Sequence, residues 1–237
     1  MSVRFCPAGD LAVMVEFKEE ISAEVNLCVR ALELLIHRKA LPGIVETVPA
    51  FRSLLVYYDP RVVDADGLRA SITGLLPEAT TAVLPPSRLV EIPCCYDDPE
   101  LGFDLAAVAG RLGLSTAEVA MLHSGADHLV YFLGFAPGQP YMTGMPPRLT
   151  IPRLETPRTR TPAGSVGIGG SQCSVYTVES PGGFWVLGRT PLRVYDPEAP
   201  DPILLRPGDN VRFRMIDRPE YDRIAAEVDA RTYRPVI

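Results

Sequence analysis

The first third of the chain alternates short β-type runs with amphipathic helical stripes. Residues 2–17 and 44–59 each predict two short strands around a turn. A helix is expected from about Ser22, which is a suitable N-cap, and a second helix from near Asp64. Their apolar faces carry Val25, Cys28, Leu32 and Leu35 in the first helix and Leu68, Ile72, Leu75 and Leu76 in the second. The order ββαββα predicts an α+β two-layer sandwich, in which both helices cover one face of a four-stranded antiparallel sheet.

A polar, proline-marked stretch at residues 77–87 predicts a boundary between an amino-terminal domain, residues 1–80, and a second domain, residues 88–237. From residue 88 onward the pattern gives about eight short strands, the number that closes a small β-barrel. The first spans residues 88–96, and later ones are expected at 192–197 and on both sides of a turn at 206–209. The last of them alternates Val211, Phe213 and Met215 toward the interior.

Two short helices are expected after the first strand of this domain. Asp104 and Ser115 are their predicted N-caps, Gly113 ends the first, and Glu118 completes a capping box with Ser115. The spacing also fits a DNA-binding helix-turn-helix, but the second helix carries no lysine or arginine. A helical hairpin packed on a sheet is the preferred interpretation. The formal net charge of −6 agrees, because nucleic-acid surfaces need clustered positive charge.

Glycine and proline are concentrated between Leu129 and Thr190, where they separate short β-type runs. Such a segment predicts a rigid frame that presents few polar groups, which suits a small-molecule site. Within it, PAGSVGIGGSQ could form a nest of backbone amides for phosphate or carboxylate oxygens. The candidate contacts there are Ser165, Gly167, Gly169 and Gly170. The alternative is that these glycines only allow a barrel to bend.

Four polar side chains of this segment are further candidates for contact with a ligand. Arg158 and Arg189 could bind a carboxylate or phosphate in bidentate fashion, although either could instead be a surface arginine paired with an acid. Gln172 follows the glycine cluster, and Tyr141 lies in a loop between Pro140 and Met142. Lysine occurs only at Lys18 and Lys39, so arginine supplies almost all positive charge, through either genomic bias or a need for planar anion recognition.

His123 is a candidate proton carrier, because the unperturbed pKa of histidine lies near neutrality. His128 and Asp127 are close to it in sequence, but a metal site needs a further ligand that the sequence does not supply. The five cysteines show no C-x-x-C spacing, so no metal is predicted. Cys173 could be a nucleophile, yet no base can be assigned and a buried small residue is the simpler interpretation. Without a signal segment or a bilayer-length apolar run, the expected location is the cytoplasm, with no membrane contact.

Four motifs in the second half, read together, carry a resemblance to a known family. They are LHSGADHLVYFLGFAPGQPYM, TPRTRTPAGSVGIGGSQCSVY, ESPGGFWVLGRTPLRVYDP and ILLRPGDNVRF. The chain resembles the KipI family, whose members are also called the B subunit of 5-oxoprolinase or allophanate hydrolase subunit 1. It departs from the family at Gln139, where an aromatic residue is usual, and at Cys173, near which the family usually has a small residue or threonine.

The resemblance implies an amino-terminal α+β sandwich followed by a cyclophilin-like β-barrel. It implies a component of an ATP-dependent 5-oxoprolinase, in which the lactam of 5-oxo-L-proline is activated by phosphorylation and opened to L-glutamate. The implied partners are a homologous protein of the KipA type, which is the C subunit of 5-oxoprolinase, and a LamB/YcsF-type protein, which is the A subunit. ATP with magnesium is the implied cofactor, bound by this chain or with the partner.

In that reaction the glycine cluster and Tyr141 would bind substrate, together with Arg158 or Arg189 as neutralising cations. Gln172 would orient the amide and His123 would move a proton. Two alternatives from other classes remain open at this point. One is an inhibitor of a sensor histidine kinase, and the other is half of a biotin-dependent carboxyltransferase in a urea or allophanate pathway.

Overall fold

The structure is a computed structural model that describes residues 3–237, so the first two residues of the predicted amino-terminal domain lie outside the described residues. The chain divides into two compact units, one ending at Pro86 and the other beginning at Ser87. No single helix in the described part of the chain is long and apolar enough to span a membrane. Two short helices, α3 (Leu105–Leu112) and α4 (Thr116–Ser124), reach that length and composition only when taken together, across a bend of 96°.

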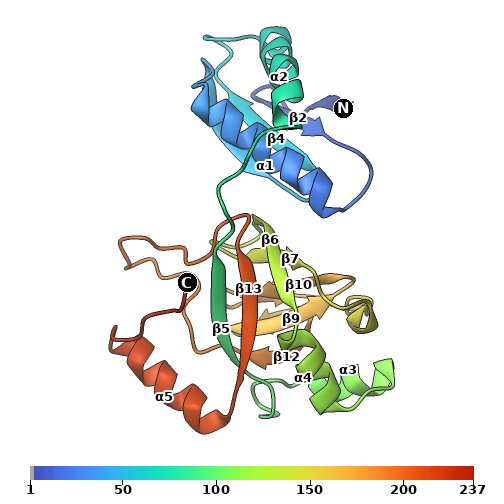
Figure 1. The fold of residues 1–237 in the computed structure, drawn as a ribbon, viewed down its shortest axis with the longest axis vertical. Helices are drawn as coiled ribbons and strands as arrows, with labels where there is room; N and C mark the ends of the chain where they lie inside the picture. Colours follow the sequence, from blue (N-terminus) through green and yellow to red (C-terminus); the bar gives the residue numbers. More distant parts are fainter. Residues whose placement is uncertain (1–2) are drawn as a thin grey trace. The chain divides into compact units, whose positions relative to one another are not determined.

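The first unit has the predicted ββαββα order (Figure 1). Its elements are β1 (Arg4–Pro7), β2 (Ala12–Glu16), α1 (Ala23–Arg38), β3 (Ile44–Pro49), β4 (Ser53–Tyr58) and α2 (Ala65–Ala79). The antiparallel sheet has the strand order β1-β2-β4-β3, and the buried faces of both helices share one core with it.

Both predicted helix starts in this unit are confirmed. The Ser22 hydroxyl accepts a hydrogen bond from the Val25 amide, and the Asp64 carboxylate accepts one from the Gly67 amide. The predicted linker at 77–87 begins too early, because α2 continues through Pro77 to Ala79. Pro77 lacks the amide hydrogen that would bond to the preceding turn of α2. Ala79, which is fully buried in the core, stabilises this last turn through its packing.

The second unit is built on a closed barrel with the strand order β10-β7-β6-β13-β5-β12-β9 (Figure 1). These strands are β5 (Leu89–Cys95), β6 (Asp127–Leu133), β7 (Pro140–Thr143), β9 (Ser165–Gly169), β10 (Gln172–Val175), β12 (Trp185–Arg189) and β13 (Asn210–Ile216). A separate two-stranded sheet pairs β8 (Arg158–Thr161) with β11 (Ser180–Gly182). The helices are α3 (Leu105–Leu112), α4 (Thr116–Ser124) and α5 (Arg218–Asp229), with a 3-10 turn η1 (Pro147–Leu149). The predicted α+β class, with a sandwich followed by a barrel, is confirmed.

The end of the barrel differs from the prediction in three places. Residues 192–197 form no strand and make only an isolated bridge, Tyr195 to Ile203, and no strand is formed before the turn at 206–209. Leu192, Val194 and Leu205 of these runs are buried, but they lie in loop segments without a continuous strand partner. In β13, Val211 and Phe213 point inward as expected, but Met215 is 48% exposed and Ile216 is buried in its place.

Candidate functional site

The connection between β6 and β7 is a fixed turn that shapes one end of a cavity. The backbone amide of Gln139 donates a hydrogen bond to the Ala136 carbonyl at 3.1 Å. The turn between these two residues contains Pro137 followed by Gly138, which has a φ of +66°. Proline followed by a residue with positive φ is the signature of a type II turn, so this sequence specifies its own geometry. Phe135, just before the turn, also has a positive φ of 70°, which costs energy for a bulky residue and is often retained at ligand-binding loops.

A cavity of about 120 Å³ opens beside this turn. Its lining residues come mainly from the two motifs that contain GQPY and SPGG. They are Phe135, Gln139, Tyr141, Arg153, Tyr176, Pro181, Gly182, Gly183 and Phe184. We call this space the Tyr141 cavity. Of the residues predicted to bind substrate, Tyr141 is the one that lines it.

Gln139 brings an unpaired acceptor to the Tyr141 cavity. Its side chain is 3% exposed, and its Oε1 atom has no hydrogen-bond partner among the described residues. A buried acceptor without a partner costs free energy, so natural proteins rarely retain one without a ligand or water to bind it. Gln139 is therefore a polar group arranged for a donor that enters the cavity.

Arg153 supplies the positive charge at the mouth of the cavity. Its guanidinium lies over the Phe184 ring, 4.7 Å from the centroid, and its Nη2 atom donates to Gln172 Oε1 at 2.9 Å. The predicted catalytic residue Gln172 therefore lies next to the cavity and holds the cation that lines it. A side chain at Gly169 would come within 2.9 Å of Arg153 Cγ and 2.8 Å of Phe184 Cδ1, so this glycine leaves room for both.

Tyr141 is held between two aromatic rings. It stacks on Phe132 at 4.7 Å and meets the edge of Phe184 at 6.4 Å between centroids. Burial raises the pKa of the Tyr141 hydroxyl, while the nearby Arg153 lowers it. The phenol is therefore neutral at pH 7 and keeps a proton that it can donate to a ligand oxygen.

The other predicted arginines lie elsewhere and have protein partners. Arg158 forms a short ion pair with Asp104, whose second oxygen accepts from the Val186 amide at 2.7 Å. Asp104 occupies the predicted N-cap position of α3, but its side chain makes no capping hydrogen bond. Its carboxylate connects β12 to Arg158 instead. Arg189 donates from Nε to the Ala163 carbonyl at 2.8 Å. The lining of the Tyr141 cavity includes neither Arg158 nor Arg189.

The backbone of the glycine cluster is engaged in the barrel wall, which opposes the predicted amide nest. Gly167 and Gly169 belong to β9, which pairs with β10 on one side and β12 on the other, so this backbone is engaged in the sheet. The Gly170 amide donates to the Ile151 carbonyl at 2.6 Å. Ser165 begins the same strand and is fully buried. The alternative interpretation fits, because these glycines build the barrel wall and make space for Phe184.

His123 lies inside the barrel core and not at the Tyr141 cavity. It is fully buried, and desolvation holds its pKa well below the ordinary value, so the ring is neutral. Its Nδ1 atom is 2.8 Å from the Tyr96 hydroxyl, and its Nε2 atom is 3.1 Å from Cys173 Sγ. Cys173 is also fully buried, and burial raises its thiol pKa, which opposes the predicted nucleophile and favours the simpler interpretation.

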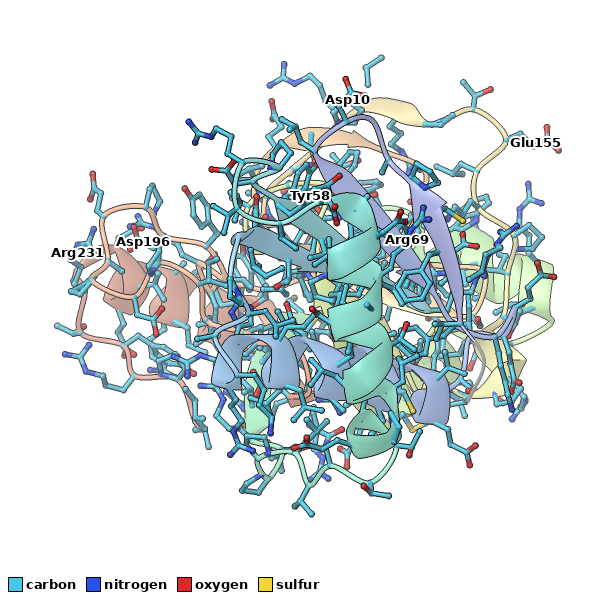
Figure 2. All side chains as sticks on the ribbon, turned by 90° about the horizontal axis from the view of Figure 1, so that it is seen from above. Asp10, Tyr58, Arg69, Glu155, Asp196 and Arg231 are labelled. Atoms are coloured by element: carbon cyan, nitrogen blue, oxygen red, sulfur yellow. The ribbon has the colours of Figure 1, made fainter. Side chains whose placement is uncertain are left out.

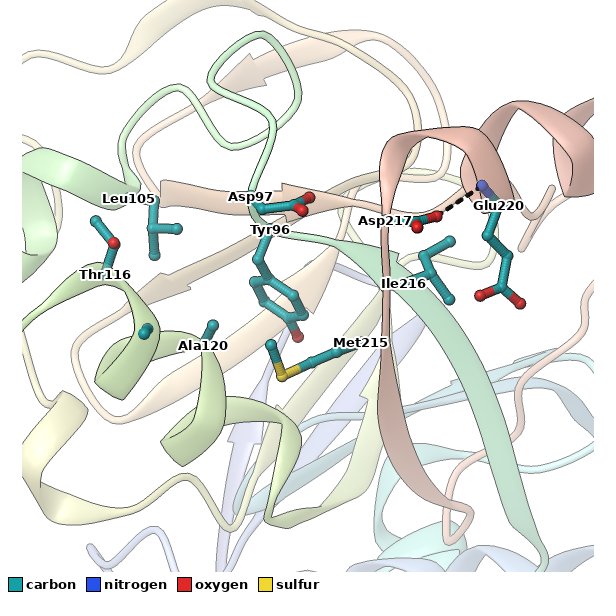
Figure 3. A pocket seen from close by; sticks show the side chains of 10 residues that line it. Tyr96, Asp97, Leu105, Thr116, Ala120, Met215, Ile216, Asp217 and Glu220 are labelled. Atoms are coloured by element: carbon teal, nitrogen blue, oxygen red, sulfur yellow. Dashed lines mark hydrogen bonds between the residues drawn. The ribbon is translucent and has the colours of Figure 1, made fainter.

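A second and larger cavity, of about 410 Å³, lies between α4 and β13 (Figure 3). Leu105, Ala120 and Met215 are among its apolar lining residues, and the Tyr96 ring lies among them. Asp97, Asp217 and Glu220 place carboxylates on one side of it, and Asp217 Oδ1 accepts from the Glu220 amide as the N-cap of α5. This space is apolar with an acidic edge, a character opposite to that of the Tyr141 cavity.

The family described as "Carboxyltransferase domain, subdomain C and D" matches residues 3–205. The B subunit of 5-oxoprolinase from Bacillus subtilis is 40% identical over 223 residues, which cover 90% of this chain and 92% of that protein. The chain belongs to the family of the carboxyltransferase domain, subdomain C and D. The Kluyveromyces lactis urea carboxylase shares the fold, with a TM-score of 0.81 at 23% identity, and covers 99% of this chain. A further solved structure, 38% identical with a TM-score of 0.76, covers 91% of this chain. This chain spans only 23% and 40% of those two solved chains.

Three parts of the Tyr141 cavity were not predicted from the sequence. Arg153 stands alone between prolines, and the SPGG motif gives no sign that Gly182 and Gly183 line a cavity. The resemblance leads to the expectation of an aromatic residue at Gln139, and this departure was the available signal. Its importance is visible only in the fold, which places it beside Tyr141 and Arg153.

Proposed function

We propose that this chain is one component of an ATP-dependent 5-oxoprolinase, which opens 5-oxo-L-proline to L-glutamate. The observation that carries the proposal is the 40% identity to the B subunit of 5-oxoprolinase over 92% of that protein's length. A B subunit implies other subunits, and we propose two partners: a homologous C-type subunit and a LamB/YcsF-type protein in the place of the A subunit. On this proposal the isolated chain does not turn over substrate.

The Tyr141 cavity supports a small lactam acid as the ligand. Arg153 offers a guanidinium to a carboxylate, and Gln139 Oε1 offers an acceptor to a lactam N–H. The neutral Tyr141 hydroxyl can donate to the lactam oxygen, where negative charge grows as the amide is activated. At about 120 Å³ the cavity fits part of such a molecule, with the remainder facing the open side.

The Tyr141 cavity and two other cavities of this chain are poor sites for ATP. The Tyr141 cavity is smaller than ordinary cofactor pockets, which are roughly 300–1,000 Å³. The larger cavity carries three carboxylates, which would repel a triphosphate. A third cavity contains Arg193, Arg231 and Arg234, but the first two are engaged by acids, among them Asp196, which lies 3.1 Å from Arg231 (Figure 2). The character of these three cavities agrees with a nucleotide that is held by one of the partner proteins.

Reconstitution with both partner proteins tests this function. The complete assembly should form glutamate from 5-oxoproline only when ATP is supplied, and omission of this chain should abolish the reaction. Arg153→Ala should lower kcat/KM at least 10-fold, because it removes the cation of the cavity. Arg160→Ala is the matched control, since Arg160 is exposed and pairs with Glu179. Equal turnover with Arg153→Ala and Arg160→Ala would remove the Tyr141 cavity from the mechanism.

A second candidate, half of a biotin-dependent carboxyltransferase, is favoured by the description of the family. It predicts transfer of a carboxyl group from carboxybiotin to a urea-type amide when a carrier protein is supplied. Assay of the same assembly with urea and a carrier protein whose biotin is already carboxylated separates the two candidates, because the carboxyl group then passes from carboxybiotin to urea and free biotinyl carrier remains. Carboxylation without 5-oxoproline cleavage would replace the first proposal by this one.

A further inference from the structure

Three buried side chains that the proposed function does not use converge inside the barrel wall. His123 comes from α4, His128 from β6 and Cys173 from β10, and we call them the His–His–Cys cluster. One donor atom from each lies within 4.8 Å of the other two, and all three residues are 0% exposed. The third ligand that the sequence could not supply is thus Cys173, which lies 45 residues beyond His128 in the sequence (173 − 128).

His128 has one ring nitrogen that no hydrogen bond explains. Its Nε2 atom lies 2.9 Å from the His123 carbonyl, and a carbonyl can only accept, so Nε2 carries the proton. Nδ1 of the neutral ring therefore presents a lone pair. This atom is buried and has no hydrogen-bond partner among the described residues. A buried lone pair without a donor is the second observation that points to a ligand.

His123 can present its own lone pair toward Cys173 of the same cluster. Nδ1 lies 2.8 Å from the Tyr96 hydroxyl, which can accept the Nδ1 proton and leave Nε2 unprotonated toward Cys173. Metal-binding histidines in general use the second nitrogen in this way, and its partner fixes the ring and its tautomer. Both histidines therefore have the hydrogen bond on the far nitrogen that a ligating histidine requires.

A hydrogen-bond network without metal explains only part of this arrangement. It accounts for the contacts of Tyr96, His123 and Cys173 but leaves His128 Nδ1 without a donor. Phe213 packs on both histidine rings, at 4.7 and 5.3 Å between centroids, and its ring offers no hydrogen-bond donor of the N–H or O–H kind. An apolar cage around two imidazoles and a thiol is a typical environment of a soft metal ion.

We propose that the His–His–Cys cluster is a buried binding site for a monovalent soft metal ion, Cu(I). Three ligands satisfy Cu(I), whereas structural Zn²⁺ almost always takes four. One thiolate and one Cu(I) cancel in charge, while Zn²⁺ would leave a net positive charge in an apolar interior at a large cost.

Binding needs no change of oxidation state. Cu(I) displaces the thiol proton of Cys173, forms a copper–sulfur bond and two copper–nitrogen bonds, and releases one proton to solvent. The 3.1 Å separation of His123 Nε2 and Cys173 Sγ must lengthen by a few tenths of an ångström to admit the ion. The ion then joins α4 to two barrel strands. Since every ligand is buried, loading should be slow and fastest during folding.

The test uses the full chain with Cys6→Ser and Cys28→Ser, which remove the two partly exposed thiols. Protein refolded without oxygen and with Cu(I) buffered by bicinchoninate should retain one equivalent of copper. X-ray absorption at the copper edge should show one sulfur and two nitrogen neighbours. At a hundredfold excess over Kd, the ion should raise the Tm by roughly 5–10 °C.

Cys173→Ser and His128→Phe should each lower the Cu(I) affinity at least 100-fold. Cys95→Ser is the matched control, because Cys95 is equally buried but belongs to a different core cluster, and it should bind like the parent. The inference is overturned if the folded parent retains no copper, or if copper bound by the parent has only sulfur neighbours. It is also overturned if Zn²⁺ binds the three residues more tightly than Cu(I). The absorption spectrum of the parent decides the matter even if a variant fails to fold.

Discussion

At the scale of single residues, Gly182 shows how the Tyr141 cavity depends on one missing side chain. A Cβ atom there would lie 2.0 Å from the Tyr176 hydroxyl and 2.6 Å from its ring. Gly182→Ala must therefore displace Tyr176, which lines the cavity and is itself buried. We expect the variant to lose about 1–3 kcal/mol of unfolding free energy in urea titrations.

Gly110→Ala is the control for this change. Gly110 lies inside α3, and a Cβ atom there meets nothing within 4 Å. Because alanine is the better helix former, this variant should gain about 0.5–1 kcal/mol. If both variants were equally stable, the position of the Tyr176 ring in this structure would be wrong.

Glu33 gives a prediction for pH at the same scale. Burial raises the pKa of its carboxyl above the ordinary value of 4.5, and a hydrogen bond from Thr47 only partly opposes this. The folded state therefore holds a proton that the unfolded state has released as the pH rises through about 4.5. Ionisation of Glu33 thus removes stability at higher pH, by the sign of the linkage relation.

Glu33→Gln keeps the shape and removes the charge. We expect the variant to be more stable than the parent at pH 7, with a difference that disappears below the ordinary pKa of the carboxyl. Thermal unfolding at pH 7, 5.5 and 4 measures it. Glu19→Gln, which changes an exposed carboxyl in the same way, serves as the control. A variant that is less stable at every pH would contradict the prediction.

At the scale of elements, α4 has a complete capping box. The Ser115 hydroxyl accepts from the Glu118 amide, and the Glu118 carboxylate accepts from the Ser115 amide at 2.8 Å. Ser115→Ala should lower stability by about 1 kcal/mol, measured as a shift of the urea midpoint with an unchanged slope. Ser124→Ala, at the far end of the same helix, should have a smaller effect. An unchanged midpoint for Ser115→Ala would mean that the cap contributes nothing.

The elements that the sequence predicted best are those specified by neighbouring residues. Ser22, Asp64 and Ser115 act on amides three residues away, and Gly113 ends its helix in the left-handed conformation. Asp104 stands in the same kind of position, but its carboxylate binds Arg158, 54 residues later. No local pattern contains that partner, so the cap was predicted and the ion pair was missed.

The candidate site was harder to predict than the helices for the same reason. The glycine-rich run looks like an anion nest when read alone, and only its pairing with β10 and β12 shows that the backbone is engaged. Tyr141 was singled out from the sequence, but the loop predicted for it is wrong, because it lies in β7 and pairs with Ser174 and Phe132. Arg153 and Gln139 were missed because their role arises when segments far apart in the sequence meet around one cavity. The roles of Gln172, Arg158, Arg189 and His123 in turnover stay predictions.

At the scale of the whole molecule, each unit contains its own hydrophobic core. The barrel closes entirely within the second unit, and β13 is the strand that completes it, since it pairs in parallel with β5 and antiparallel with β6. Its inward residues Val211 and Phe213 lie in the centre of that core. Among the described residues, none of the first unit's core belongs to the core clusters of the second.

Residues 87–237 expressed alone should therefore fold. With 151 residues (237 − 87 + 1) and a core of its own, this fragment is large enough for cooperative unfolding. We expect a single sigmoidal urea transition and well-dispersed amide resonances. A fragment of residues 87–209 is the control: it lacks β13, which leaves β5 and β6 with unpaired edges and exposes the apolar barrel interior. It should show neither feature. If the longer fragment also lacked a cooperative transition, the barrel would depend on the first unit for its stability, and the two cores could not be treated as separate.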